Sequence, residues 1–260
     1  LDLASSLPSA EGAAEIEVPA LMIAWSVEEP SRVGEVALFE MEGSSRVLGR
    51  GDSGSSSARV TFGPFRPGRA SEAPRGLEGP GISREQARIT PKRGQLVVEQ
   101  IGRCTHVFRG AKAFRCVLAQ GDTLLLKGQV LLLCTRRPAR PPPLRDYPAS
   151  LLGRFGEPCE LGLLGESTAA WALRDAAAFY AKAGAHALVL GPSGAGKELC
   201  ARAIHKLSAR AAGPFVARNA ATIPASLLEA ELFGNVKNYP NPGMPERPGL
   251  VGAAEGGTLF

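Results

Sequence analysis

The amino-acid sequence predicts two folded regions of different class, an all-β sandwich followed by part of an α/β domain, with a proline-rich linker between them. The chain has 260 residues, and a domain holds about 150 residues, so two domains are expected. Short β-type runs punctuated by Gly and Pro extend to residue 137. After residue 160, strand-like runs alternate with helical patterns, and residues 138–160 hold six prolines.

The N-terminal region, residues 20–137, is predicted to be a sandwich or barrel, because many short strands separated by turns are typical of such folds. Residues 1–19 precede it as a tail. The stretch Gly63–Gly81 contains four Pro and five Gly, so we expect a long loop there. The predicted strands are Val18–Val27, Val33–Met41, Ser45–Gly49, Ala58–Phe62, Gln86–Thr90, Gln95–Glu99, Phe114–Leu118, Thr123–Leu126 and Val130–Cys134.

Residues 138–160 are predicted to form a semi-rigid linker, because consecutive prolines lack backbone donors and favour extended polyproline geometry. In residues 161–260, Ser167 can cap a helix that runs to about Ala183, with Gly184 just past its end. The alternation that follows predicts a parallel α/β sheet. Its elements are a strand at His186–Leu190, a helix at Gly196–Ala212, a strand at Phe215–Ala217 and a helix from Pro224 that ends before Gly234.

The composition argues against several protein classes. Hydrophobic residues make up 44% and charged residues 21% of the chain, as in ordinary soluble proteins. No apolar run reaches the length of about 18 residues that a membrane span requires. The five cysteines are odd in number and form no Cys-x-x-Cys pair, which argues against a disulfide framework and a zinc site. We therefore expect a protein of the reducing cytoplasm.

Charge is distributed unevenly along the chain. Residues 1–43 carry a net charge of −8, residues 44–160 of +11 and residues 161–260 of +2. The basic middle suggests an acidic or phosphorylated partner. The alternative is a solvated surface in an Arg-rich chain, since 23 of the 30 basic residues are Arg.

The strongest chemical signal is a glycine-rich loop between a predicted strand and a predicted helix. Glycines allow backbone N–H groups to surround phosphate oxygens, and the helix N-terminus favours an anion. A lysine at its end would place a positive charge on the β- and γ-phosphates, whereas the generic motif continues with Ser or Thr to hold Mg²⁺. A glycine-rich turn without a ligand is the alternative. The candidate nucleotide-binding residues are Gly191, Pro192, Ser193, Gly194, Ala195, Gly196, Lys197 and Glu198.

Glu198 after the loop lysine is usual in the AAA+ domain of bacterial enhancer-binding proteins, the sigma-54-dependent transcription activators, which residues 161–260 resemble. The resemblance rests on Leu163–Ser167, Pro214–Ala221, Leu227–Gly234 and Gly256–Phe260. It implies binding of ATP with Mg²⁺, self-assembly into a ring and remodelling of RNA polymerase that carries sigma-54. Asn219 matches the position of the family's nucleotide-switch asparagine. A capping or turn role is the alternative for Asn219.

The C-terminal segment departs from that family at two points. The family's sigma-54-contacting loop, Gly-Ala-Phe-Thr-Gly-Ala, is replaced by the sequence of residues 235–245, which lacks the Phe-Thr tip. The Walker B acids, sensors and arginine finger of the family would lie beyond Phe260. We therefore expect these residues to bind nucleotide but to hydrolyse it hardly at all on their own, because phosphoryl transfer needs a positioned metal and water. No helix-turn-helix pattern is present, so no residue is assigned to DNA binding.

The N-terminal region resembles the forkhead-associated (FHA) domain, a β-sandwich that binds phosphothreonine peptides through its loops. The resemblance rests on Gly49-Arg50, on Gly81–Gln86 and on Gly121–Leu124. It implies that Arg50 and Ser83 contact the phosphate and that Arg84 contacts the peptide. Gln86 replaces the family's His, and Gly102–Thr105 replaces its Asn-Gly-Thr, so a peptide-gripping Asn is missing. A sandwich without phosphopeptide binding is the alternative.

Together these features predict an ATP-binding transcriptional regulator of the sigma-54 type, gated by a phosphopeptide-sensing FHA-like domain. Its expected partners are a phosphothreonine protein, sigma-54 RNA polymerase and further copies of the chain. The alternative is an adaptor that binds nucleotide and phosphopeptide without hydrolysis or sigma-54 contact.

Overall fold

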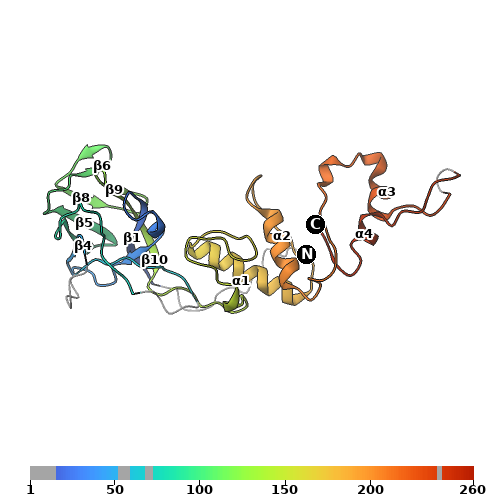
Figure 1. The fold of residues 1–260 in the computed structure, drawn as a ribbon, viewed down its shortest axis with the longest axis horizontal. Coiled ribbons are helices and arrows are strands. Elements are labelled where there is room, and N and C mark those ends of the chain that lie inside the picture. Colours follow the sequence, from blue (N-terminus) through green and yellow to red (C-terminus); the bar gives the residue numbers. More distant parts are fainter. Residues whose placement is uncertain (1–15, 52–58, 68–72, 239–241) are drawn as a thin grey trace. The chain divides into compact units, whose positions relative to one another are not determined.

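A computed structural model describes residues 16–51, 59–67, 73–238 and 242–260 of the chain. The chain divides into two compact units, with the boundary between Pro143 and Leu144. Figure 1 labels most strands of the first unit and the α-helices of the second. Among the described residues, no helix is long and apolar enough to cross a membrane.

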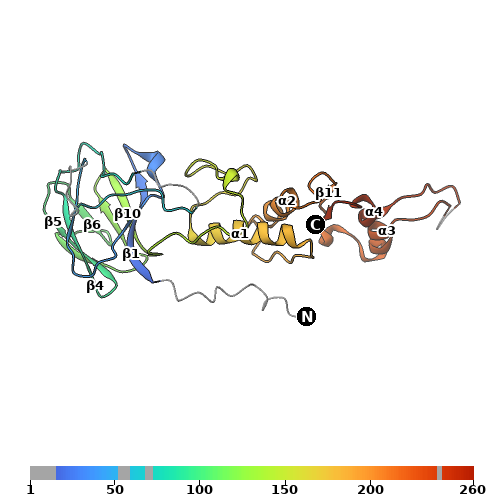
Figure 2. The same cartoon turned by 90° about the horizontal axis from the view of Figure 1, so that it is seen from below.

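The first unit consists of two antiparallel sheets. One sheet has the order β2-β1-β10-β9-β6-β7 and the other the order β3-β4-β5-β8. Strands β1 and β10 pair along their length, from Glu17 with Pro138 to Ser26 with Val130, and lie side by side in both views (Figures 1 and 2). The strands are β1 (Glu17–Ser26), β2 (Val36–Leu38), β3 (Arg46–Leu48), β4 (Ala87–Lys92), β5 (Gln95–Gln100), β6 (His106–Phe108), β7 (Ala111–Lys112), β8 (Arg115–Leu118), β9 (Thr123–Leu126) and β10 (Val130–Pro138).

Apolar side chains from both sheets meet in one core. Because successive side chains of a strand point to opposite faces, alternate residues enter this core. In β4 the buried residues are Ala87, Ile89 and Pro91, whereas Arg88 is exposed. Leu21 of β1 and Leu132 of β10 belong to the same buried cluster. The predicted all-β sandwich is therefore confirmed, and its loops connect strands that enclose a buried core.

Some predicted strands differ from those in the structure. The described part of the Ala58–Phe62 run forms isolated bridges, from Arg59 to Val47 and from Phe62 to Arg75, and no named strand. Strands β6 and β7 were not predicted, because each is short and lies among Arg and Gly residues. The described residues of Gly63–Gly81 contain no named strand, as expected of a loop.

The second unit is organised around two helices, α1 (Thr168–Ala183) and α2 (Lys197–Leu207). Helix α1 has the predicted bounds. The side chain of Ser167 accepts a hydrogen bond from the N–H of Ala170, and Gly184 ends the helix in the left-handed region at φ 63°. Helix α2 ends earlier than predicted, because Ser208 leaves the helical conformation with φ −86° and ψ 165° and its hydroxyl donates to the carbonyl of His205.

The second half of the predicted linker packs against α1. Oδ1 of Asp175 accepts hydrogen bonds from three successive N–H groups, those of Arg145, Asp146 and Tyr147, at 2.8–3.0 Å. Trp171 of α1 shares a buried cluster with apolar residues from the linker side: Tyr147, Leu152, Cys159, Leu161 and Leu163. Residues 144–160 therefore belong to the second unit.

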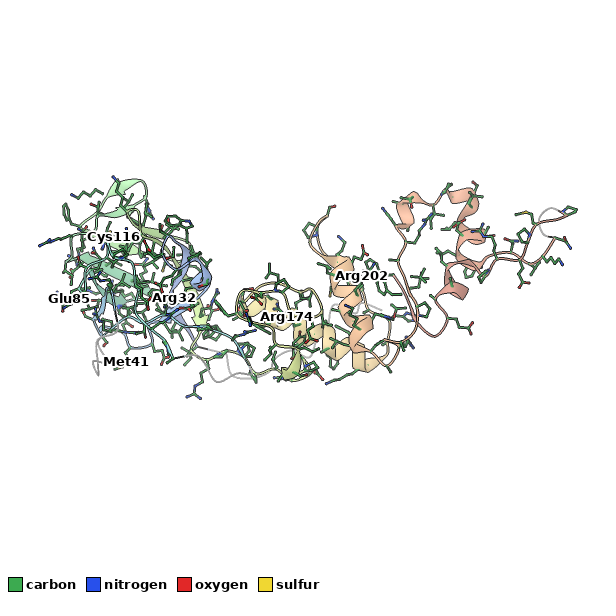
Figure 3. The ribbon with its side chains drawn as sticks, in the orientation of Figure 1. Arg32, Met41, Glu85, Cys116, Arg174 and Arg202 are labelled. Atoms are coloured by element: carbon green, nitrogen blue, oxygen red, sulfur yellow. The ribbon has the colours of Figure 1, made fainter. Side chains whose placement is uncertain are left out.

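Arg174 of α1 holds the chain immediately before the helix. Its guanidinium donates to the carbonyls of Leu163 and Gly165, both at 2.8 Å, and lies 4.4 Å from the ring centroid of Trp171. Figure 3 labels Arg174 on α1 and Arg202 on α2. The chain that precedes α1 is thus bound to the helix by charged side chains as well as by apolar packing.

The predicted α/β sheet is only partly present. Strands β11 (Phe215–Val216) and β12 (Thr258–Leu259) pair in parallel. The predicted strand at His186–Leu190 is not observed, and Leu188 and Leu190 are 79% and 80% exposed. A strand requires a neighbour for its backbone hydrogen bonds, and no described segment pairs with these residues. The predicted helix after Pro224 appears as a 3₁₀ turn at Ala225–Leu227 followed by α3 (Leu228–Phe233), and α4 (Gly249–Ala253) follows.

Candidate functional site

The loops of the β-sandwich bring together the three residues predicted to bind phosphopeptide. The N–H of Arg50 donates to the carbonyl of Ser83 at 3.0 Å, so the two phosphate-binding candidates are adjacent. Gly49 allows this approach, because a Cβ atom there would overlap the carbonyl of Arg84. Arg84 is exposed, whereas Arg50 and Ser83 are half-buried. The structure therefore places Arg50, Ser83 and Arg84 on one surface.

Arg59 holds the backbone at that surface. Its guanidinium donates to the carbonyl of Arg84 and, at 3.3 Å, to the carbonyl of Arg50. One side chain thereby fixes the backbone on both sides of the candidate site. The sequence did not indicate this role, because Arg59 is separated from Arg84 by the long loop and only the fold brings them together.

Gln86, which stands where the FHA pattern has His, joins two loops with its buried side chain. Its Oε1 atom accepts from the N–H groups of Ser83, at 3.3 Å, and Cys104, at 3.2 Å. Its Nε2 atom donates to the carbonyl of Cys104 at 2.8 Å and lies 3.0 Å from Nε2 of His106. These backbone partners fix the orientation of the amide, so Nε2 of Gln86 is a donor towards His106.

His106 is consequently held neutral. It is 1% exposed, and desolvation lowers its pKa to about 4. Since Nε2 of His106 must accept the hydrogen bond from Gln86, its proton resides on Nδ1. Neither Gln86 nor His106 was predicted as a site residue. Their signal in the sequence is weak, because a polar residue within a short β-type run is usually exposed.

Arg103 follows Gly102 in the neighbouring loop. The N–H of Arg103 donates to Oγ of Ser83 at 3.0 Å. A Cβ atom at Gly102 would lie 2.7 Å from Cβ of Ser83 and 2.6 Å from Oε1 of Gln86, so only Gly fits this approach. The loop that replaces the FHA Asn-Gly-Thr segment therefore still packs against the predicted phosphate-binding serine.

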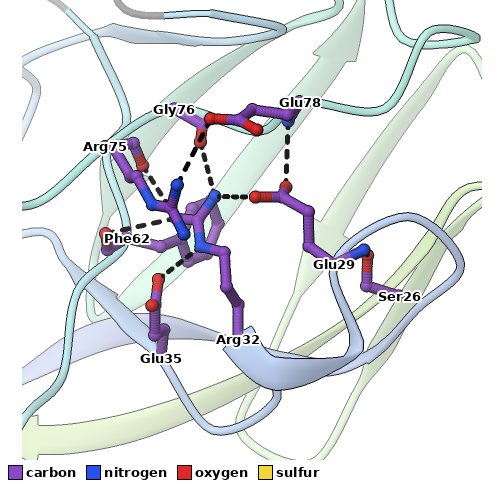
Figure 4. Close-up of polar contacts among 8 residues, drawn as sticks. All are labelled: Ser26, Glu29, Arg32, Glu35, Phe62, Arg75, Gly76 and Glu78. Atoms are coloured by element: carbon purple, nitrogen blue, oxygen red, sulfur yellow. Dashed lines mark hydrogen bonds and ion pairs between the residues drawn. The ribbon is translucent and has the colours of Figure 1, made fainter.

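A buried arginine, Arg32, binds the chain at Arg75 and Gly76 (Figure 4). Arg32 is 1% exposed and forms ion pairs of 2.8 Å with both Glu29 and Glu35. Burial acts to lower the pKa of the Arg32 guanidinium, but its hydrogen bonds to the two carboxylates raise the pKa overall, so Arg32 keeps its charge. It also donates to three backbone carbonyls, those of Phe62, Arg75 and Gly76.

Two of the carbonyls that Arg32 binds, those of Arg75 and Gly76, directly precede Leu77. The N–H of Gly51 donates to the carbonyl of Leu77 at 2.7 Å, and Leu77 forms a bridge with Arg50. The N–H of Glu78 donates to Glu29 at 2.9 Å. The ion-pair network of Arg32 thus supports Arg50 through a single intervening backbone segment.

The second candidate site is the glycine-rich loop of residues 191–198. Gly194 and Gly196 have φ values of 77° and 84°, which L side chains rarely adopt. Helix α2 begins at Lys197, and no side chain caps it at Gly196. Its first N–H groups therefore remain suited to an anion. Nζ of Lys197 donates to the carbonyls of Gly191 and Pro192, at 2.9 and 2.8 Å, and so lies over the loop.

The residues of this loop fit a phosphate better than a metal ion. Glu198 pairs with Arg202 one turn further along α2, at 2.7 Å, so its carboxylate faces along the helix. No group of three acidic, His or Cys side chains in the described parts of the chain could hold a metal. A cavity of about 500 Å³ lies between residues 184–189, the two long helices and β12, and none of residues 191–198 lines it.

Asn219, the predicted nucleotide switch, caps a short turn. Its Oδ1 accepts from the N–H of Ala221 at 3.0 Å, and its carbonyl accepts from the hydroxyl of Thr222 at 2.7 Å. This arrangement matches the capping alternative. A switch role for Asn219 stays a prediction.

Comparison with known proteins identifies relatives of the second unit. Residues 163–260 match the family model described as Sigma-54 interaction domain. Transcriptional regulator VasH of Vibrio cholerae is 46% identical over 98 residues, which are 38% of this chain and 18% of that protein. Response regulator protein PilR of Pseudomonas aeruginosa is 43% identical over 103 residues, or 40% of this chain and 23% of that protein. The chain thus spans less than a quarter of the length of these relatives.

Two solved structures resemble parts of the chain. NtrX from Brucella abortus is 45% identical over 37% of this chain and 21% of its own, with a TM-score of 0.34. The FHA domain of CT664 from Chlamydia trachomatis is 17% identical over 45% of this chain and 95% of its own, with a TM-score of 0.32. From the family match and its relatives, residues 163–260 of this chain are identified as similar to the sigma-54 interaction domain of bacterial transcriptional regulators.

Proposed function

We propose that this chain is a regulator of sigma-54-dependent transcription whose β-sandwich binds a phosphothreonine peptide and whose second unit binds ATP. The observation that carries the proposal is the presence, in one chain, of two features. Residues 163–260 match the sigma-54 interaction domain, and the sandwich presents Arg50, Ser83 and Arg84 on one surface. A cytoplasmic location and self-association through the second unit belong to the same proposal.

The chemistry of the sandwich loops supports phosphate recognition. The guanidinium of Arg50 can donate two parallel hydrogen bonds to a phosphate, and Ser83 adds a hydroxyl donor. Because Oγ of Ser83 already accepts the N–H of Arg103, its own proton is available to a ligand. Arg84 is exposed beside them and can contact the peptide backbone.

The glycine-rich loop supports nucleotide binding. The open N–H groups at the start of α2 would bind phosphate oxygens, and Lys197 would exchange its two carbonyl partners for the β- and γ-phosphates. Mg²⁺ would arrive with the nucleotide and be held largely by phosphates and water, as is usual for this ion. Asn219 would report the nucleotide state.

Two single-residue variants test the two halves of the proposal. Arg50→Gln should abolish the difference in affinity between phosphothreonine and threonine peptides, measured by fluorescence anisotropy. Lys197→Ala should abolish ATP binding, measured by calorimetry. Undiminished ATP affinity in the lysine variant would remove the loop from the proposal, and equal binding of both peptides by the unaltered chain would remove the sandwich.

A second candidate function is an adaptor that binds phosphopeptide and nucleotide without contacting sigma-54. The region that replaces the family's contact loop favours it. Asn235 and Arg247 bridge at its base, Nδ2 of Asn235 donates to the carbonyl of Pro245 at 2.9 Å, and residues 235–245 lack the Phe-Thr tip. Cross-linking of the chain to purified sigma-54 in the presence of ATP separates the candidates, since the adaptor forms no cross-link.

A further inference from the structure

Arg103 occupies a fixed position beside the candidate phosphate site. Its N–H is bound to Oγ of Ser83 at 3.0 Å. The next residue, Cys104, is held through both its N–H and its carbonyl by Gln86, at 3.2 and 2.8 Å. The backbone of Arg103 is therefore held next to Ser83, so the Arg103 side chain extends from a position beside the candidate phosphate site.

The side chain of Arg103 is free to take an anionic partner. Arg103 is exposed and forms no ion pair with any carboxylate in the described part of the chain. Glu85, which follows Ser83 and Arg84, is also exposed and forms no ion pair among the described residues. Glu85 marks the outer edge of the sandwich in Figure 3.

Arg103 also adds to a local excess of positive charge. The candidate site includes Arg50, Arg84 and Arg103, and the guanidinium of Arg59 donates to the carbonyls of Arg84 and Arg50. One phosphate carries a charge of about −1.5 to −2 at neutral pH. In the proposed function Arg50 and Ser83 bind the phosphate and Arg84 contacts the peptide backbone, so the Arg103 guanidinium remains for a separate anion.

We propose that Arg103 is a second anion-binding residue of this site and selects phosphothreonine peptides that carry an Asp or Glu next to the phosphorylated residue. The inference rests on the proposed phosphopeptide function and names the kind of peptide that the site prefers. The planar guanidinium matches a carboxylate in a paired, two-bond geometry. The FHA pattern binds the peptide through an Asn, whereas in this chain Arg103 binds a carboxylate of the peptide.

The test uses the full chain and labelled peptides in fluorescence anisotropy. One peptide set has phosphothreonine with neutral flanks, a second has one Asp placed at each flanking position in turn, and a third repeats both with unphosphorylated threonine. The best Asp peptide should bind about fivefold more tightly than the neutral peptide, the upper range for a solvent-exposed ion pair.

Arg103→Gln should remove the fivefold preference while retaining the discrimination between phosphothreonine and threonine. Arg93→Gln is the matched control, because Arg93 is an exposed arginine in the turn at the opposite end of β4, and it should change neither quantity. An Asp preference that survives Arg103→Gln overturns the inference, as does the absence of any Asp preference in the unaltered chain. If no phosphopeptide binds at all, the proposed function itself falls, and that result is distinct from both.

Discussion

Replacing Arg32 with Met should destabilise the β-sandwich more than any surface substitution. The change leaves the carboxylates of Glu29 and Glu35 without their cation and removes the donor from three carbonyls. Removal of one partner of a buried ion pair costs about 3–5 kcal/mol. Since a domain is stable by about 5–15 kcal/mol, we expect the loss of a large part of the stability of this unit.

Urea unfolding can measure this effect within the full chain. The chain has two tryptophans, Trp25 in β1 and Trp171 in α1. In a Trp171→Phe background, the fluorescence of Trp25 reports on the sandwich. With a slope of about 1–3 kcal/mol per molar urea, a loss of about 3–5 kcal/mol should lower the midpoint by about 1–5 M.

Two further variants decide whether the reasoning is right. Arg88→Met changes an exposed arginine of β4 and should alter stability by about 0.5 kcal/mol or less. Adding Glu29→Gln and Glu35→Gln to Arg32→Met should recover part of the loss, because no uncompensated charge then remains buried. An Arg32→Met midpoint that matches that of Arg88→Met would refute a structural role for the network.

Three other changes test separate features. The pKa of His106 is about 4 in the folded chain and about 6.5 in the unfolded chain. Between these pH values the unfolded state therefore binds more protons than the folded state. Lowering the pH from 7 to 4.5 should then reduce the free energy of unfolding of the sandwich by about 2–3 kcal/mol. Urea midpoints at both pH values measure this, and His106→Leu should flatten the dependence. Gly49→Ala places a Cβ against the Arg84 carbonyl. It should weaken phosphopeptide binding, measured by anisotropy, and lower the free energy of unfolding by about 1–3 kcal/mol, measured by urea unfolding. Unchanged values would contradict the close packing. Asp175→Ala should expose the N–H groups of Arg145, Asp146 and Tyr147, seen as faster amide hydrogen exchange there but not in the sandwich.

The sequence predicted those parts of the fold that local pattern determines. Helix α1 has a Ser cap and a Gly stop, and both act as expected. Strand β9 has the predicted bounds, Thr123–Leu126, because its alternating side chains enter the core. By contrast, the apolar run His186–Leu190 forms no strand, since strand formation depends on a neighbouring ladder and not on the run alone.

The candidate site was predictable only in part. Arg50, Ser83 and Arg84 could be named because their positions match the FHA pattern, and their binding roles stay a prediction. The supporting side chains Arg59 and Gln86 act through contacts across 25 and 18 residues of chain, respectively. Such contacts depend on how the loops pack, and no local pattern indicates them.

If the sandwich binds a phosphopeptide as proposed, the buried amide of Gln86 affects both the rate and the affinity of that binding. Because the same side chain holds the backbone at Ser83 and at Cys104, the two recognition loops lose their conformational freedom when the protein folds. A peptide then meets a preorganised surface and does not have to order it, which improves affinity without adding any contact. Removing the hydrogen bonds of the Gln86 amide should slow peptide association and make the binding entropy less favourable.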